Sequence, residues 1–295
     1  MRILNFGSLN LDYVYQVDHF VQPGETLLAY AQAVNPGGKG LNQSVALARA
    51  GADTCHAGCV GIGGEMLVDV LREAGVDIRH IAKTEEIQGN AVIQVDRTGE
   101  NCILLFGGSN QCITAKQVEK TLEHFDEGDY LLLQNEINCL PLIVRLAGEK
   151  KMKIVLNPSP YNEKLDQIDY SQLDWLIVNE VEMEQLSGFK SPEKAWEKLH
   201  ARYPGLSLLV TLGEEGSVAF TNRETVTQKA VIVKAVDTTA AGDTYTGYFL
   251  AGIMNGLSLQ ESMQRAGIAA AKAVTRRGAA SSIPKKEELL ISFGE

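Results

Sequence analysis

The sequence predicts an α/β fold of three layers, in which helices cover both faces of a mostly parallel central sheet. Short, continuous apolar runs alternate with helical patterns along most of the 295 residues, and such runs are typical of strands that are buried on both faces. Two extended stretches, at about 12–35 and 88–106, interrupt this alternation. We therefore expect a single domain over 1–295 with a small β-sheet lid made of these two segments.

The strands of the central sheet are predicted where apolar residues run without interruption. In chain order they are Ile3–Phe6, Thr54–Val60, Tyr130–Leu133, Ile154–Leu156, Trp175–Val178 and Leu208–Thr211. Helices are predicted where apolar residues fall on one stripe, as Leu41, Val45 and Ala48 do. They are Lys39–Ala50, Glu65–Ala74, Pro141–Glu149, Val181–Ser187, Glu193–Arg202, Ala241–Met254 and Leu259–Arg276.

The lid segments follow a different pattern. Tyr13–Val34 is predicted to be extended, and Gln88–Phe106 is predicted to be a hairpin that turns at Arg97-Thr98-Gly99-Glu100. Both carry apolar residues in extended patterns, but a small sheet cannot bury two faces by itself. One face of the lid is therefore expected to need a partner.

Charge and cysteine content exclude several classes of protein. There are 27 Lys and Arg against 37 Asp and Glu, a formal net charge of −10, which argues against nucleic-acid and anionic-membrane partners. The five cysteines are scattered without a CxxC pair, as expected of reduced thiols. No uncharged apolar run could span a bilayer, and Met1–Asn10 is too short for a signal peptide. We expect a cytoplasmic protein.

Several common catalytic motifs are absent from the sequence. Gly38-Lys39 is followed by glycine rather than Ser or Thr, so this is not a P-loop, and the glycines at 61–64 lack the third glycine of a dinucleotide-binding turn. Neither HExxH nor Gly-x-Ser-x-Gly occurs. These absences exclude zinc proteases, lipases and Rossmann dehydrogenases.

Two loops that open helices, one rich in glycine and the other in small residues, are more informative. In Gly37–Asn42 the glycines alone would indicate only a tight turn, but Lys39 and Asn42 add polar donors beside the free N–H groups of the helix start. In Asp237–Asp243 small residues form a backbone nest for anions. Asp243 there is either a helix cap or a base for a phosphoryl acceptor whose hydroxyl must lose a proton.

Together the two loops resemble the two sequence signatures of the ribokinase-like (PfkB-type) carbohydrate kinase family. Gly37–Ser44, with Gly51 and Gly61 downstream, is similar to the first signature, and Asp237–Gly247 is similar to the second. Other segments resemble the family in the same order, so that the resemblance runs from residue 3 to about 284: Gly7–Asp12, Pro23–Thr26, Asn157–Pro160, Asn179–Glu182, Thr211–Gly213 and Ala273–Ala279.

The resemblance implies roles for residues on the sugar side of a kinase site. Asp243 would be the catalytic base, and the N–H groups of Ala241, Gly242 and Asp243 would form the anion hole. The residues implied to bind the sugar are Asn10, Asp12, Gly38, Lys39, Asn42, Glu136 and Asp243.

It also implies ATP, Mg²⁺ and a monovalent cation, usually K⁺, as cofactors. Nucleotide binding is implied for Asn179, Thr211, Gly213, Gly216 and Gly242, and Asn179 with Glu182 would arrange Mg²⁺. The monovalent cation would be held mainly by backbone carbonyls at Asp237, Thr239, Ala273, Arg276, Gly278 and Ser282.

The implied activity is ATP-dependent phosphorylation of the primary hydroxyl of a small sugar, with D-ribose to D-ribose 5-phosphate as the leading reaction. Deoxyribose, another pentose or ketose, and a nucleoside are the alternative substrates, because Tyr248 and Gly107 depart from the family pattern. From another class, the chain could be an inactive sugar-binding regulatory relative, although a pure binder has no use for the base and metal residues. Members commonly form two-fold homodimers through their lids, and we expect a homodimer here.

Overall fold

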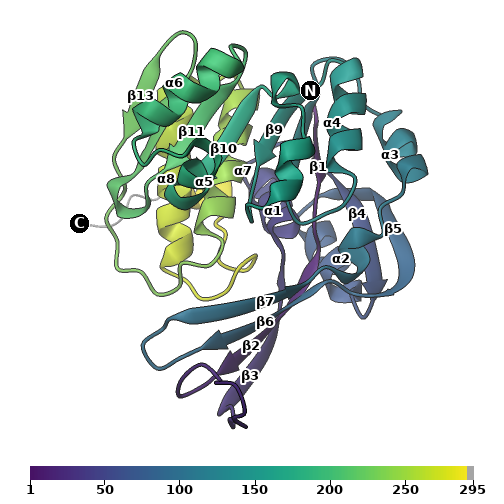
Figure 1. The fold of residues 1–295 in the computed structure, drawn as a ribbon, viewed down its shortest axis with the longest axis vertical. Helices are drawn as coiled ribbons and strands as arrows, with labels where there is room; N and C mark the ends of the chain where they lie inside the picture. The colour runs from purple at the N-terminus through teal and green to yellow at the C-terminus, as the bar shows by residue number, and fades with distance from the viewer. Residues whose placement is uncertain (291–295) are drawn as a thin grey trace.

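The central sheet lies among the helices of the main body, in the upper part of the view (Figure 1). In the computed structural model, which describes residues 1–290, its nine strands are β1 (Ile3–Phe6), β4 (Thr54–Ile62), β5 (Asp77–Ile87), β8 (Tyr130–Gln134), β9 (Lys153–Asn157), β10 (Trp175–Asn179), β11 (Ser207–Thr211), β12 (Ser217–Phe220) and β13 (Thr225–Gln228). Their order is β13-β12-β11-β10-β9-β8-β1-β4-β5, and all pairs are parallel except those of β12 with its two neighbours.

Helices cover both faces of this sheet. They are α1 (Lys39–Arg49), α2 (Glu65–Glu73), α3 (Ala115–Leu122), α4 (Leu140–Glu149), α5 (Glu180–Ser187), α6 (Pro192–Arg202), α7 (Ala241–Met254) and α8 (Leu259–Val274). One cluster of buried residues packs helices α3, α4, α5 and α6 against one face of the sheet. The other cluster packs α1, α2, α7 and α8 against the opposite face. Leu131 and Leu133 of β8 face the first cluster and Leu132 faces the second, which is why these strands are continuously apolar. The predicted three-layer fold is confirmed.

A second, four-stranded sheet projects from this body as the lid (Figure 1). Its strands are β2 (Asn10–Gln16), β3 (Ala31–Gly37), β6 (Asn90–Val95) and β7 (Asn101–Phe106), in the order β3-β2-β6-β7. The β6–β7 hairpin turns at residues 96–100 as predicted. The prediction that 13–34 is extended throughout is wrong for residues 17–30, which form no strand. A turn in which the Glu25 amide donates to the Gln22 carbonyl (3.0 Å) interrupts the chain there.

Helices α1 and α7 pack closely behind the site. A Cβ at Gly247 would overlap Ala46 and crowd the Leu47 amide, so only glycine permits this approach. The neighbouring Tyr248 is buried, and its hydroxyl donates to the Pro284 carbonyl (2.7 Å). Tyr248, which departs from the family pattern, therefore packs against the chain near Pro284 and away from the ligand side.

Some elements were not predicted. They are α3, β12, β13 and β5, and β5 has a mixed polar sequence because it is an edge strand with only one sheet neighbour. The single domain over 1–295 stays a prediction, and residues 291–295 lie outside the described part of the chain. Within residues 1–290, none of the helices has the length and apolar character needed to cross a membrane.

The topology determines where a ligand site can form. The chain leaves β1 toward β4 and β5 on one side and returns to β8 on the other, so the strand order reverses at β1. In open α/β sheets, ligands bind at such a point, outside the carboxyl ends of the strands. The segments that follow β1, β8, β9, β10 and β11 therefore converge on one edge of the sheet.

Candidate active site

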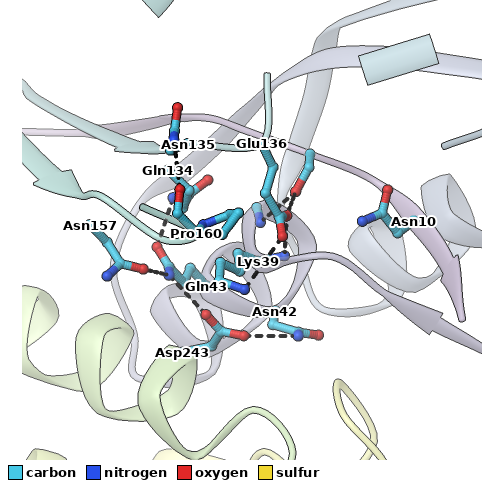
Figure 2. Close-up of polar contacts among 12 residues, drawn as sticks. Asn10, Lys39, Asn42, Gln43, Gln134, Asn135, Glu136, Asn157, Pro160 and Asp243 are labelled. Carbon is cyan, nitrogen blue, oxygen red and sulfur yellow. Dashed lines mark hydrogen bonds and ion pairs between the residues drawn. The ribbon is translucent and has the colours of Figure 1, made fainter. Parts of the chain in front are cut away.

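Asp243 lies in the first turn of α7 and faces the start of α1 (Figure 2). Its two carboxylate oxygens accept hydrogen bonds from Nδ2 of Asn42 (2.9 Å) and Nε2 of Gln43 (2.8 Å). The residue is half-buried, with one side open to a cavity. Burial raises the pKa of Asp243, while Lys39 and the two amide donors oppose this rise. A carboxylate held in this way can accept a proton and remains accessible to a ligand.

The loop before α1 brings Lys39 against Glu136. Gly38 lies directly before the first residue of α1 and has φ 91°, a backbone conformation that favours glycine. The Lys39 amide donates to Glu136 (3.1 Å), its ammonium lies 3.4 Å from the other carboxylate oxygen, and the Ser8 hydroxyl also donates to Glu136. Burial disfavours the charge of Lys39, but Glu136 and Asp243 outweigh it and raise the pKa of the ammonium.

Asp12 stands in β2 at the base of the lid, facing the same group of charges. A Cβ at Gly37, in the neighbouring strand, would overlap its carboxylate, so glycine there makes room for Asp12. Burial, together with the charges of Glu136 and Asp243, raises the pKa of Asp12 to about 7. Three acidic side chains and one cation thus surround one polar space.

Asn10 is held at the edge of this space by a residue that sequence reasoning missed. Nδ2 of Asn110, in the short helix Gly108–Gln111, donates to Oδ1 of Asn10 (2.7 Å) and to the Leu9 carbonyl (3.1 Å). Oδ1 of Asn110 accepts from the Leu9 amide (2.9 Å). Asn110 therefore ties the chain after β7 to the start of β2 where the lid joins the body.

A cavity of about 240 Å³ lies on the other side of Asp243. It is lined by Lys39, Asn157, Ser159, Ile177, Val178, Asn179, Glu182, Thr211, Thr238, Ala240, Ala241, Gly242, Asp243 and Thr246. The N-terminus of α7, whose first-turn amides lack helical acceptors, opens onto it. The Ala241 amide donates to the Thr238 carbonyl (3.2 Å), so Gly242 and Asp243 offer the better-placed donors for an anion.

Asn179 and Glu182 line this cavity but also bind each other. Oδ1 of Asn179 accepts from the Glu182 amide (2.8 Å), and Oε2 of Glu182 accepts from the Asn179 amide (3.1 Å), which caps α5. The predicted pair is brought together at the cavity, and the capping contacts fix both side chains there.

A second cavity, of about 370 Å³ and largely apolar, adjoins the first through Thr238 and Ala241. Gly213 and Gly216 line it, with residues 228–233, Ala235 and one face of α8. Gly216 has φ 110°, and a Cβ there would overlap the Gln228 carbonyl. A flat apolar group with a polyanionic tail fits this pair of cavities. Thr211 lies on the side of the polar cavity.

The two segments predicted to hold a monovalent cation do converge. Asp237 accepts from the amides of Thr239 and Gly278 (2.9 Å each). Burial opposes the charge of Asp237, but these hydrogen bonds lower its pKa. Ala273 accepts from the Arg276 amide (3.0 Å), and Ser282 donates through its hydroxyl to Ala279 (2.8 Å), while the Arg276 side chain pairs with Glu288 instead.

The chain is similar to carbohydrate kinases over nearly its whole length. The model of the pfkB family carbohydrate kinases matches residues 2–286. A ribokinase of Haemophilus influenzae is 35% identical, over 96% of this chain and 95% of that protein. The solved ribokinase of Thermotoga maritima has 35% identity and a TM-score of 0.87, covering 98% of each chain. A ribokinase of Arabidopsis thaliana, solved with ribose and ATP, has 27% identity and a TM-score of 0.83, covering 98% and 97%.

Proposed function

Because the chain belongs to the pfkB family of carbohydrate kinases, we propose that it transfers the γ-phosphoryl group of ATP to the primary hydroxyl of D-ribose, giving D-ribose 5-phosphate. The observation that carries this proposal is the position of Asp243. Its carboxylate lines the cavity at the N-terminus of α7 and is also close to Asp12, Lys39 and Glu136, which surround the polar space. A base between an acceptor site and an anion site is what transfer to a hydroxyl requires.

The residues divide the work as follows. Asn10, Asp12, Gly38, Lys39, Asn42 and Glu136 bind the sugar hydroxyls, and Asp243 takes the proton of the attacking hydroxyl. The amides at the start of α7 stabilise the charge that develops on the transferred phosphoryl group. The apolar cavity takes the adenine ring, and the lid excludes water from the reaction.

A sugar panel tests this function directly. We expect ADP release to depend on added sugar, with the highest kcat/KM for D-ribose among D-ribose, 2-deoxyribose, other pentoses, ketoses and nucleosides. No ADP release with any acceptor, despite measurable sugar binding, would instead show an inactive sugar-binding relative.

The donor set at the cavity also fits Mg²⁺. Glu182 is buried and lines the cavity beside Asn179, and carboxylate and amide oxygens are the ligands that Mg²⁺ takes, in part through water. We propose that these two residues hold Mg²⁺ near the phosphates, where the bound ion would neutralise phosphate charge.

The loops around Asp237 support a K⁺ site in the same way. The amides of Val236 and Asp237 both donate to the Val274 carbonyl (2.7 and 3.1 Å), which places the two loops side by side next to α7. We propose that a bound cation orders these loops, and we expect activity to rise when K⁺ replaces Na⁺. A cation titration of rigorously depleted enzyme measures this. A flat response would contradict the site.

Sugar binding is expected to release protons near neutral pH. The pKa of Asp12 is raised to about 7 by burial and by neighbouring carboxylates, so the free protein holds a proton there below that pH. Hydroxyls that donate to the carboxylate favour its ionised form and lower its pKa in the complex. The affinity for D-ribose should therefore rise as the pH rises through about 7. Calorimetry in two buffers of different ionisation enthalpy measures the released proton, and Asp12→Asn should abolish it. Equal heats in both buffers would count against this expectation.

The lid supports the proposed homodimer. Register places Val34, Val92 and Leu104 on the face opposite Asp12, and Leu104 is 72% exposed. We propose that a second copy covers this face, because an exposed apolar sheet face is unfavourable in water. Light scattering should give twice the monomer mass, and Leu104→Asp should lower it. A monomer mass for the unmodified protein, with or without ligands, would rule out the lid dimer.

We also propose a cytoplasmic location, without nucleic-acid or membrane partners. The net charge of −10 supports this, as do the unpaired thiols of all five cysteines in the described residues.

A further inference from the structure

A chain of buried polar side chains runs from Asp243 into the core beneath the site, and part of it is visible in Figure 2. Its members lie between the sheet and α1 and have no measurable exposure: Asn5, Gln43, Ser44, His56 and Gln134 are each 0% exposed. Burial of so many polar groups is unfavourable unless each is held by defined hydrogen bonds. None of these side chains can reach a bound ligand.

Gln43 connects this hydrogen-bonded network to the carboxylate of Asp243. Its Nε2 donates one hydrogen to Oδ1 of Asp243 (2.8 Å) and the other to Oδ1 of Asn157 (3.0 Å). Its Oε1 accepts from Nε2 of Gln134 (2.7 Å). A reversed amide would place oxygen against two oxygens and nitrogen against an N–H donor, so only one orientation of Gln43 is satisfied.

The other side chains of this hydrogen-bonded network fix the orientation of Gln134. Its Nε2 also donates to Oδ1 of Asn5 (2.9 Å), and Nδ2 of Asn5 donates to the Gly40 carbonyl (2.7 Å) and to Oγ of Ser44 (2.9 Å). Oγ of Ser44 also lies 2.8 Å from Nδ1 of His56. Burial lowers the pKa of His56 to about 3, so that the ring is neutral and Nδ1 can accept. The Gly40 carbonyl can only accept, and it therefore fixes the direction of the hydrogen bonds that run from Asn5 through Gln134 and Gln43 to Asp243.

We propose that Gln43 is a positioning residue for the catalytic base, and that its N–H, oriented by Gln134, keeps the Asp243 carboxylate ionised and turned toward the acceptor hydroxyl. Gln43 can only donate at this contact, and a donor stabilises a carboxylate relative to a carboxylic acid. Asn42 donates to the other oxygen of the carboxylate (2.9 Å). The inference rests on the proposed role of Asp243.

The pH profile of kcat separates this role from a merely structural one, because its acid limb reports the pKa of the base in the ternary complex. Gln43→Met removes a charge-assisted hydrogen bond, and we expect the limb to move to higher pH by about one unit or more. Gln134→Met leaves the Gln43 amide free to rotate, and we expect a smaller shift in the same direction. Above the limb, both variants should approach the wild-type kcat more closely than they do below it.

Gln117→Met is the matched control. Gln117 is also an inward-facing glutamine, whose Nε2 donates to the Gly58 carbonyl (2.7 Å) away from the site, so its loss should leave the limb in place. An unshifted limb in Gln43→Met, or an equal shift in Gln117→Met, would overturn the proposal. If Gln43→Met does not fold, the limb of Gln134→Met decides by the same criterion. Full turnover in Asp243→Asn would instead refute the role of the base itself.

Discussion

Asp243→Asn is expected to lower kcat by roughly 10²–10⁴, the usual contribution of a general base. The substitution keeps the shape of the side chain but removes the group that accepts the proton. It also replaces two acceptor oxygens with one, so that either Asn42 or Gln43 loses its partner. Affinity for D-ribose and ATP should change only several-fold, because the other residues proposed to bind the sugar and the nucleotide stay in place.

Single-turnover kinetics and sugar-binding calorimetry on this variant measure the two effects separately. Glu193→Gln is the matched control, because Glu193 is also a carboxylate in the first turn of a helix, α6, but lies outside the site. It tests whether the loss of a charge at a helix N-terminus is enough to slow turnover. Near-wild-type turnover in Asp243→Asn, or an equal loss in Glu193→Gln, would exclude the assignment of Asp243 as the base.

Lys39→Ala is expected to lower kcat/KM by roughly 10²–10³, the magnitude found when one electrostatic donor at a reacting group is removed. Among residues 1–290, Lys39 is the only one that forms an ion pair with Glu136, whose side chain is 7% exposed. Its loss leaves Glu136, Asp12 and Asp243 close together without a compensating cation. It also removes a cation from the wall of the 240 Å³ cavity at the N-terminus of α7, where we propose that the phosphates bind.

The pH dependence of this variant gives a second readout. Lys39 lowers the pKa of both Asp12 and Asp243, so its removal should raise both values and move the acid limb of kcat/KM to higher pH. Lys39→Arg keeps the charge and should restore the position of the limb more fully than the rate, since the guanidinium has a different shape. Activity of Lys39→Ala within tenfold of wild type, with an unmoved limb, would show that Lys39 is not part of the site.

The sequence indicated the fold well where burial leaves a local pattern. Strands such as β8 and β11 are apolar without interruption because both of their faces are covered, and this pattern can be recognised from one sequence. β5 was missed because an edge strand has no second neighbour and tolerates polar residues. The prediction that residues 17–30 are extended gave no weight to Pro23-Gly24, a dipeptide typical of turns, in which Gly24 has φ 84° at the turn between Gln22 and Glu25.

The site shows the same division between local and long-range information. Motif residues such as Lys39 and Asp243 were found because each lies in a short loop of glycines or other small residues before a helix. Asn110, which holds Asn10, and Gln43, which contacts Asp243, were given no role because their partners lie 100 and 200 residues away along the chain. Which distant side chains meet depends on the topology of the sheet, and local sequence patterns do not determine this.

That this chain phosphorylates the 5-hydroxyl of D-ribose is tested most directly by identifying the product. The enzyme is incubated with ATP and D-ribose, and the phosphorylated sugar is examined by phosphorus–proton correlation NMR. We expect the phosphate to couple to the two protons on C5, with one ADP formed per sugar phosphate. A phosphate that couples to the proton on C1, or ADP that accumulates without any sugar phosphate, would contradict the proposed reaction.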